Sequence, residues 1–233
     1  MQDILDLVVQ ETGYYYNPTI ELNRTLNDNV AIPTFQTESE KQEPCAIVGY
    51  GPSLLETYEL LEQFSVIISC SGSHRFLLER GIAPTYHVEV DPGEAKAKFT
   101  GVSSADTTYL ISDTCSPLVF KQLLEKKRKI LKFGYSVGLD VGHQAIHMAT
   151  ELGYRDIHLV GFDGSGLYAG EHNKKVQNIS VKCGDLEFVS DRDLIHSVLY
   201  FPILMSQLPK GTTLSFSGEG LLQAYLSRIN NQK

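Results

Sequence analysis

The chain has 233 residues, 42% of them hydrophobic and 21% charged, a composition typical of a soluble globular protein with one sizeable core. A formal net charge of −8 argues against broad nucleic-acid binding, because that requires Lys and Arg side chains to displace counterions from phosphates. No apolar run approaches the roughly 18 residues that cross a bilayer, so we expect no membrane partner.

The N-terminal segment is expected to be an appendage. Residues 1–12 read as a short amphipathic helix, and they carry acids where a signal peptide would carry basic residues. Residues 17–44 are polar and rich in asparagine, as in an arm or linker. We therefore predict an N-terminal helix and polar arm over residues 1–43, followed by a single domain over residues 44–233.

From Cys45 onward, six short apolar runs alternate with segments of helical spacing. Strand, helix and strand at this spacing predict crossover connections and hence a largely parallel sheet. The predicted fold class is α/β, with a doubly wound, mostly parallel Rossmann-like sheet that has helices on both faces. The predicted strands are CAIVGYG, SVIISCSG, TYHVEVD, TTYLISD, KILKFGY and DIHLVGFD.

The pattern changes after the sixth strand. Two alternating runs in ISVKCGDLEFVS flank Gly184 and Asp185, which is the signal of a hairpin. A helix over about residues 191–208, the strand TTLSFSG and a last helix then follow. We expect a small β-hairpin insertion after strand six, and then a final strand–helix unit.

Cysteine usage bears on the cellular compartment. The four cysteines, Cys45, Cys70, Cys115 and Cys183, are scattered without a CxxC pair, and three of them lie in or beside strand-like runs. Buried free thiols fit a reducing environment. Together with the missing signal peptide, they predict a cytoplasmic protein.

Ligands of doubly wound sheets bind beyond the carboxyl ends of the strands, where helix N-termini also offer free N–H groups. In this chain, the residues that follow each predicted strand are small, hydroxylic or acidic. Helix N-caps favour such residues in any protein, so each Ser or Thr has a structural explanation as well. The nucleotide-binding candidates are Gly49, Gly51, Pro52, Ser53, Ser71, Gly72, Ser136, Gly138 and Ser165.

Three carboxylates also follow predicted strands, namely those of Asp91, Asp113 and Asp163. If they converge on one edge of the sheet, they repel one another unless a cation or protons intervene. A divalent metal bound together with a phosphorylated ligand would compensate for this repulsion. We therefore expect a divalent metal ion at these three residues.

The predicted strand over residues 85–91 has an unusual polar face. Alternation places His87, Glu89 and Asp91 on one side of it. A strand buried on both sides should be apolar throughout. The polar face therefore predicts a bordering cleft or, alternatively, an edge strand with one wet face.

The bend GYGPS over residues 49–53 is the most informative of the strand ends. Gly49 and Gly51 permit a sharp turn and close approach to a ligand, Pro52 suits the first position of a helix, and Ser53 supplies a hydroxyl. The bend is neither a GxGxxG fingerprint nor a P-loop. It indicates a nucleotide or phosphate site, with a purely structural turn as the alternative.

Four stretches, in this order and spacing, resemble the MptE-like family over about residues 44–222. They are AIVGYGPSL, ISCSGSHRFLLERGIAPTYHVEVDP, SVGLDVGHQAIHMATELGYRDIHLVGFDGS and LSFSGEGLL. The family includes archaeal hydroxymethylpterin diphosphokinases and the central domain of bacterial motility accessory factors, which glycosylate flagellin. The resemblance implies a nucleotide-dependent transferase with a Rossmann-like fold.

The resemblance also implies roles for individual residues. It marks residues 51–53 as contacts to the nucleotide phosphates, and Asp91 and Asp163 as polar groups of the active cleft. His172 falls where relatives carry a loop histidine, which could serve as a general base toward an acceptor hydroxyl. The catalytic candidates are therefore Asp91, Asp163 and His172.

Two further stretches match the family less completely. Ser71 and Gly72 stand where relatives often have Asn-Gly, so a side-chain amide contact to the ligand is in doubt. Residues 218–220 match the glycine-rich turn near the family's end. Glu219 in this turn is equally explained as an acid favoured at the start of a helix.

Our preferred functional hypothesis is Mg²⁺-assisted pyrophosphate transfer from ATP to a pterin-like hydroxymethyl acceptor. One alternative is a sialyltransferase-like glycosyltransferase that uses a CMP-activated nonulosonic acid. Another is a noncatalytic nucleotide-binding module. All three hypotheses require a small-molecule nucleotide partner, and the sequence leaves a homo-oligomer open.

Overall fold

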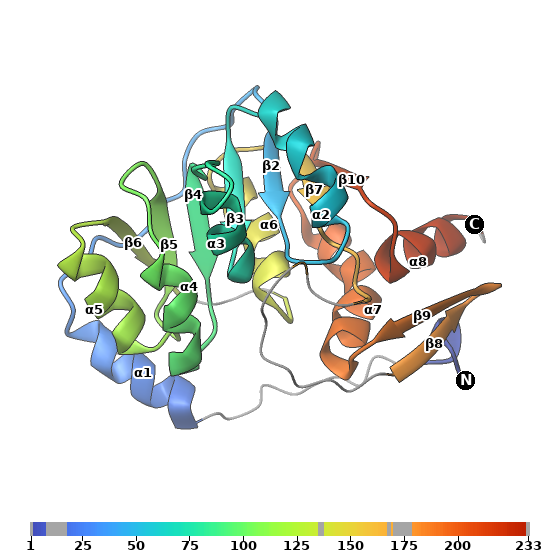
Figure 1. The fold of residues 1–233 in the computed structure, drawn as a ribbon, viewed down its shortest axis with the longest axis horizontal. Coiled ribbons are helices and arrows are strands. Elements are labelled where there is room, and N and C mark those ends of the chain that lie inside the picture. Colours follow the sequence, from blue (N-terminus) through green and yellow to red (C-terminus); the bar gives the residue numbers. More distant parts are fainter. Residues whose placement is uncertain (1, 8–17, 135–137, 167–168, 170–178, 232–233) are drawn as a thin grey trace.

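The computed structural model describes residues 2–7, 18–134, 138–166, 169 and 179–231. Seven parallel strands form the main sheet in the order β10-β7-β2-β3-β4-β5-β6 (Figure 1). Their bounds are β2 Cys45–Val48, β3 Ile67–Cys70, β4 Tyr86–Glu89, β5 Thr108–Ser112, β6 Lys129–Phe133, β7 Asp156–Val160 and β10 Thr213–Ser217. This architecture confirms the predicted fold class.

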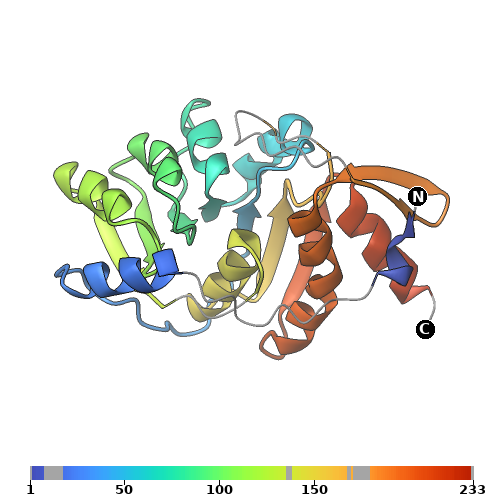
Figure 2. The same cartoon turned by 90° about the horizontal axis from the view of Figure 1, so that it is seen from below.

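Helices cover both faces of the sheet (Figure 2). In β2, Cys45 and Ile47 pack toward one layer, while Ala46 and Val48 pack toward the other. Because both layers are apolar, the strands read as continuous hydrophobic runs. The first layer holds α6 Val141–Glu151 and α7 Arg192–Gln207; the second holds α2 Leu54–Thr57, α3 Gly72–Leu78, α4 Ala97–Gly101 and α5 Pro117–Glu125.

The helix after β2 is much shorter than its sequence pattern predicts. α2 has only 4 residues, and the chain continues as the 3-10 helix η2 Tyr58–Gln63. Another 3-10 helix, η3 Glu94–Lys96, precedes α4. The dipole of so short a helix as α2 is small. A phosphate site at this bend would therefore depend on individual N–H groups.

The order of the strands creates a switch point between β2 and β7. From β2 to β6 each strand adds on the same side, whereas β7 and β10 add on the other side of β2. In doubly wound sheets, ligands bind beyond the carboxyl ends of the strands where this reversal occurs. The sequence did not determine the strand order, so it did not single out this pair.

A small second sheet lies beside the main one. The antiparallel hairpin β8 Ile179–Cys183 and β9 Leu186–Ser190 follows β7 and confirms the predicted insertion. The helix expected at residues 1–12 is wrong for residues 2–6, which form strand β1 Gln2–Asp3 and the 3-10 helix η1 Ile4–Asp6. β1 pairs with β8, and Ile4 is fully buried. These tertiary contacts override the helical pattern.

The C-terminal helix α8 Leu221–Asn230 packs against α7 and β8. Arg228 of this helix contacts both carboxylate oxygens of Asp3, at 2.6 Å and 2.8 Å. This ion pair joins the N-terminal strand β1 to helix α8. Among the described residues, no helix combines the length and apolar character needed to span a bilayer.

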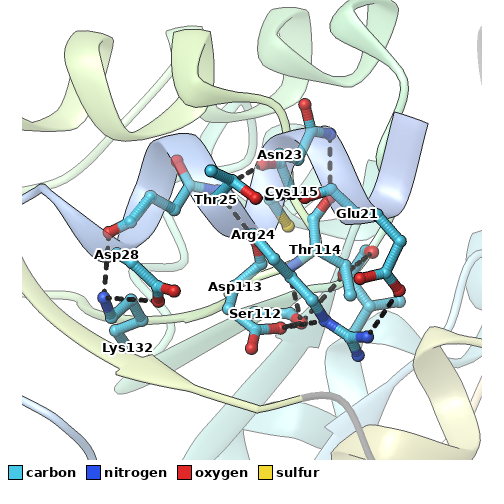
Figure 3. Close-up of polar contacts among 12 residues, drawn as sticks. Glu21, Asn23, Arg24, Thr25, Asp28, Ser112, Asp113, Thr114, Cys115 and Lys132 are labelled. Atoms are coloured by element: carbon cyan, nitrogen blue, oxygen red, sulfur yellow. Dashed lines mark hydrogen bonds and ion pairs between the residues drawn. The ribbon is translucent and has the colours of Figure 1, made fainter. Parts of the chain in front are cut away.

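Part of the segment expected to be a polar arm is folded onto the sheet. Residues 18–28 form helix α1 Pro18–Asp28, which lies at the carboxyl ends of β4 and β5 (Figure 3). Further along, Phe35 N donates to Lys132 O, and Lys132 N donates to Pro33 O, so this stretch covers the edge of β6. The division at residue 43 stays a prediction.

Candidate functional site

Asp163, which follows β7, is the central polar group at the switch point. Its side chain is almost completely buried, and the backbone N–H of Ser53 donates to Oδ2 at 3.0 Å. The other carboxylate oxygen, Oδ1, is buried without a hydrogen-bond partner, as is Ser53 Oγ. Unpaired buried polar atoms are costly, so they indicate a site where a ligand or water completes the hydrogen bonds.

Burial raises the pKa of Asp163, and contacts with Ser53 only partly offset this. A carboxyl group with a raised pKa can accept a proton more readily than an exposed Asp. It can also become a ligand for a cation that arrives with a substrate. Asp163 is therefore the group at this edge that is best suited to chemistry.

The bend over residues 49–53 is bound to β7 by its backbone. Gly49 N donates to Val160 O, and Gly51 N donates to Gly161 O, both at 2.8 Å. A Cβ on Gly51 would lie 2.1 Å from Asp163 Oδ2. Close packing against Asp163 is therefore the primary reason for a glycine at position 51. The sequence alone did not reveal this reason. The bend remains partly exposed.

A second glycine turn closes around the same carboxylate. Gly218 has φ +96°, and a Cβ there would lie 2.2 Å from Ser53 Oγ. A Cβ on Gly220 would lie 2.4 Å from the backbone oxygen of Asp163. Two Gly-x-Gly turns, one after β2 and one after β10, thus enclose Asp163. Glu219 itself is exposed.

Ser165 performs a structural role in this arrangement. Its hydroxyl accepts a hydrogen bond from Leu221 N at 3.1 Å, at the start of α8. Leu222 N donates to Asp163 O, which fixes the same turn to the helix. The predicted contact from Ser165 to a nucleotide would compete with this cap. Pro52 lies on the rim, against Gly166.

The turn after β3 borders the bend. Ser71 has φ +45°, a conformation that L-residues rarely adopt, and its Oγ is buried without a partner. A Cβ on Gly72 would lie 2.6 Å from the Tyr50 ring, so a glycine is required there. Strain in a non-glycine residue beside a candidate site is an indication of function.

The three predicted metal ligands do not gather in one place. Asp91 is paired with Lys96 at 3.3 Å, and Asp113 with Arg24 at 3.4 Å. Strands β3 and β2 separate β4 from β7, so Asp91 and Asp163 follow strands about 14 Å apart. Among the described residues, no three His, Cys, Asp or Glu side chains are grouped to hold a metal ion. A site shared by all three carboxylates therefore has no support in the geometry.

The polar face of β4 is buried in the protein interior. β4 lies between β3 and β5, so the edge-strand alternative is wrong. His87 and Glu89 are both 0% exposed, so they do not border an open cleft as expected. His87 Nδ1 lies 3.1 Å from Ser69 Oγ, which is also 3.0 Å from Nδ1 of His74 in α3. A hydrogen-bonded network between the sheet and α3 thus accounts for the polarity of His87. Glu89 is outside this network: its Oε1 accepts from the backbone N–H groups of Val90 and Asp91, and its Oε2 is buried without a partner.

One of the remaining candidates, Gly138, lies shortly before the start of α6. Gly138, with φ +81°, packs against His143 just before α6. Asp140 accepts a hydrogen bond from His143 N and caps this helix. Ser136 and His172 lie outside the described residues, so their predicted roles stay predictions.

Comparisons with known proteins add an independent line of argument. A sequence model described as "6-hydroxymethylpterin diphosphokinase MptE-like" matches residues 20–166, more than half of the chain. A search of curated protein sequences found no match. Five chains of solved structures match, among them the MAf glycosyltransferase from Magnetospirillum magneticum AMB-1, with a TM-score of 0.69 and 17% identity.

That structural match covers 88% of this chain but 37% of the glycosyltransferase, so the chain spans little more than a third of that protein's length. At this identity, the shared property is the fold. The match of the family model has a different meaning, because it rests on sequence and extends from α1 through β7 to the turn around Asp163. The chain belongs to the MptE-like family.

Proposed function

We propose that the protein is a nucleotide-dependent transferase whose donor binds beyond the carboxyl ends of β2 and β7. The observation that carries this proposal is the state of Asp163, a buried carboxylate with one unpaired oxygen between two Gly-x-Gly turns. This position is the switch point of the sheet, where ligands of doubly wound folds bind. Family membership and the fold likeness to a glycosyltransferase both support a transferase.

The reaction we propose first is pyrophosphate transfer from ATP to a pterin-like hydroxymethyl group. The description of the matching family supports this choice. The acceptor hydroxyl oxygen would form a bond to the β-phosphorus, while the bond between that phosphorus and the oxygen of the α-phosphate breaks. AMP leaves with the electron pair, and the hydroxyl proton passes to a base or to water. Such transfers depend mainly on positioning and charge stabilisation.

Mg²⁺ is compatible with the residues at this edge. The ion is usually held by one or two carboxylates together with substrate phosphates and water. Asp163, with its free Oδ1, offers one such carboxylate. When bound, Mg²⁺ would neutralise charge that develops on the phosphates. Asp163 would hold the ion, and the Ser53 and Ser71 hydroxyls, both unpaired, would orient the phosphate oxygens.

Asp91 and His172 keep their proposed catalytic roles at the acceptor side. Asp91 has a side chain that is 39% exposed, although Lys96 already pairs with it. Asp91 is therefore already partly satisfied, whereas Asp163 keeps one buried oxygen without a partner. We therefore assign the larger catalytic effect to Asp163.

Glycosyl transfer from a CMP-activated nonulosonic acid is the second candidate. The fold likeness to the MAf glycosyltransferase, which extends over 88% of this chain, favours it. The same edge would then bind the cytidine nucleotide. An acceptor hydroxyl would form a bond to the anomeric carbon of the sugar while the bond from that carbon to the phosphate oxygen breaks, so that CMP leaves with the electron pair and the hydroxyl proton passes to a base or to water. A noncatalytic nucleotide-binding module would keep the binding site without turnover.

A binding panel distinguishes these functions. Thermal shifts are measured with ATP, CTP, CMP and a CMP-sugar, each with and without Mg²⁺, and ³¹P NMR follows AMP formation with 6-hydroxymethylpterin. Stabilisation by ATP with Mg²⁺ and release of AMP support pyrophosphate transfer. A response to cytidine compounds alone favours sugar transfer, and binding without turnover favours the noncatalytic module. No response to any nucleotide contradicts the proposed function.

A further inference from the structure

Helix α1 buries polar side chains where a surface helix usually buries apolar ones. Asn23 and Asn27 face the body of the protein and are 5% and 0% exposed. A surface helix of a globular protein normally packs its apolar stripe on the core and turns its polar side to water. The buried amides of α1 therefore need an explanation, and the turns beneath them provide it.

The Asn23 amide joins two turns of the carboxyl edge. Its Nδ2 donates to Pro92 O at 3.1 Å and to Thr114 O at 2.9 Å (Figure 3). Pro92 belongs to the turn after β4, and Thr114 belongs to the turn after β5. Because one nitrogen carries both donors, this single side chain fixes the two turns relative to each other.

Asn27 has the same chemistry but a different pair of acceptors. It lies one helical turn after Asn23 on the same face of α1. Its Nδ2 donates to Asp113 O and Cys115 O, both at 2.8 Å, and both acceptors belong to the turn after β5. The two asparagines thus differ in one respect, which is the bond from Asn23 to the turn after β4.

The turn after β4 carries Asp91 and is held rigidly from the side of the sheet. Glu89 Oε1 accepts from the N–H groups of Val90 and Asp91, at 3.0 Å and 3.2 Å. Thr114 Oγ1 donates to Val90 O at 2.7 Å. Gly93 N donates to Asp91 Oδ1 at 2.8 Å. The bond from α1 to the carbonyl that follows Asp91 holds the same turn from the opposite side.

Asp91 itself is both oriented and accessible. Its side chain is 39% exposed, and Lys96 Nζ lies 3.3 Å from Oδ2. Both carboxylate oxygens therefore have a fixed direction, while the group can still meet a molecule from outside. A group that acts on a substrate gains from being held in place before the substrate binds.

We propose that Asn23 is a positioning residue, which holds the turn after β4 so that Asp91 faces the acceptor hydroxyl. This inference rests on the proposed function, in which Asp91 acts at the acceptor side. A displacement of about 1 Å at a reacting group can cost up to about 100-fold in rate, so the loss of one bridging amide is sufficient to be measured. Helix α1 thereby serves the acceptor, whereas the turns around Asp163 serve the donor.

Steady-state kinetics with ATP, Mg²⁺ and 6-hydroxymethylpterin compare Asn23→Ala with Asn27→Ala. Each variant loses one buried amide with two hydrogen bonds, so the midpoints of urea unfolding should fall by similar amounts. Asn23→Ala should lower kcat about tenfold and keep the KM for ATP within about twofold, whereas Asn27→Ala should keep kcat within about twofold. A merely structural role for Asn23 predicts equal kcat in the two variants, and that result would overturn the proposal.

A double-mutant cycle tests whether the effect of Asn23 passes through Asp91. If it does, the double variant Asp91→Asn/Asn23→Ala should turn over no more slowly than Asp91→Asn alone. Losses that multiply in the double variant would show that Asn23 acts independently of Asp91, and they would overturn the proposal.

Hydrogen–deuterium exchange without ligands separates this inference from the proposed function. The N–H groups of Asp91 and Gly93 are bonded within the turn, and they should exchange at least about threefold faster in Asn23→Ala than in Asn27→Ala. Equal exchange in the two variants of an enzyme whose wild type turns over would overturn the inference and leave the proposed function intact. A wild type that converts no nucleotide would contradict the proposed function, and the positioning role would fall with it.

Discussion

Aspartates at two parts of the same carboxyl edge of the sheet have opposite environments. Beyond β4 and β5, Asp91 pairs with Lys96 and Asp113 pairs with Arg24, and α1 supplies donors to the adjacent carbonyls. Beyond β2 and β7, Asp163 is buried, and none of the ion pairs found among the described residues includes it. A strand-end aspartate is therefore a stronger candidate for binding the nucleotide where the fold leaves it partly unsatisfied.

The largest expected effect follows from replacing the aspartate at each of the two edges. Asp163→Asn should lower turnover by at least about 100-fold, because it removes the carboxylate that we propose holds Mg²⁺ beside the donor phosphates. Asp113→Asn should change turnover less than about threefold, because its carboxylate serves Arg24. Steady-state kinetics with the substrate found in the nucleotide panel measure both variants. Equal losses of turnover in the two variants would contradict the proposed difference between the two parts of the edge.

The Asp163→Asn variant should keep its stability even though it loses turnover. Burial raises the folded-state pKa of Asp163 above its ordinary value. The stability that this shift contributes is therefore present at low pH and is lost as the pH rises above that value. At pH 7 the charged carboxylate is a cost, so Asp163→Asn should unfold at an equal or higher temperature than the wild type. A large drop in melting temperature would contradict this interpretation.

The buried polar network beneath α3 should make the half of the sheet around β4 sensitive to acid. Burial lowers the pKa of His74 to about 4, so the folded protein holds this residue neutral. Its contribution to stability is complete above the unfolded pKa of about 6.5 and is lost as the pH falls toward 4. The expected loss is up to about 3 kcal/mol, measured by urea unfolding between pH 7 and 4. His74→Gln should reduce this dependence, while buried His87, whose pKa is also lowered by burial, maintains the rest of it. An unchanged slope would exclude His74 as a source.

Two glycine variants compare close packing around Asp163 with packing at an open position. Gly51→Ala places a methyl group 2.1 Å from Asp163 Oδ2 and should cost about 1–3 kcal/mol. Gly101→Ala is the control, because a Cβ there meets nothing closer than 3.8 Å. Urea unfolding should separate the two variants. If Gly51→Ala is as stable as the wild type, the bend has more space than the structure indicates.

The smallest effect on nucleotide binding is expected where α1 meets the other part of the edge. Asn27→Ala removes the donor for Asp113 O and Cys115 O and should cost about 1–3 kcal/mol. Because α1 lies away from Asp163, nucleotide affinity should stay within about twofold of the wild type. Urea unfolding and a nucleotide titration measure the two quantities. A large loss of affinity would place α1 in the site.

The strands were predictable from the sequence, because buried parallel strands appear as continuous apolar runs. The residues that follow them were also predictable, because turns at the carboxyl ends of such strands favour small residues. Hairpin β8–β9 was equally clear from its alternating runs around Gly184. The strand order was not predictable, since it depends on which strands pair across long connections. For this reason Asp91, Asp113 and Asp163 were expected to form one cluster. The packing role of Gly51 was hidden for the same reason.

Helix α1 was missed because its sequence signal is inverted. Asparagines at positions 23 and 27 suggest a polar linker, and only the carbonyls of distant turns make them favourable. The buried polarity of β4 was read as a cleft because its partner, His74, lies in another element. In each case a polar residue was satisfied by a group far away in the sequence. Such long-range pairing leaves no local pattern.

Hydrogen–deuterium exchange with and without the nucleotide identified in the binding panel tests the central claim most directly. The account predicts slower exchange at residues 49–53 and 218–220, which enclose Asp163, and no change at residues 91–93 and 113–115 beneath α1. Protection confined to the β4–β5 edge, with residues 49–53 unaffected, would contradict it.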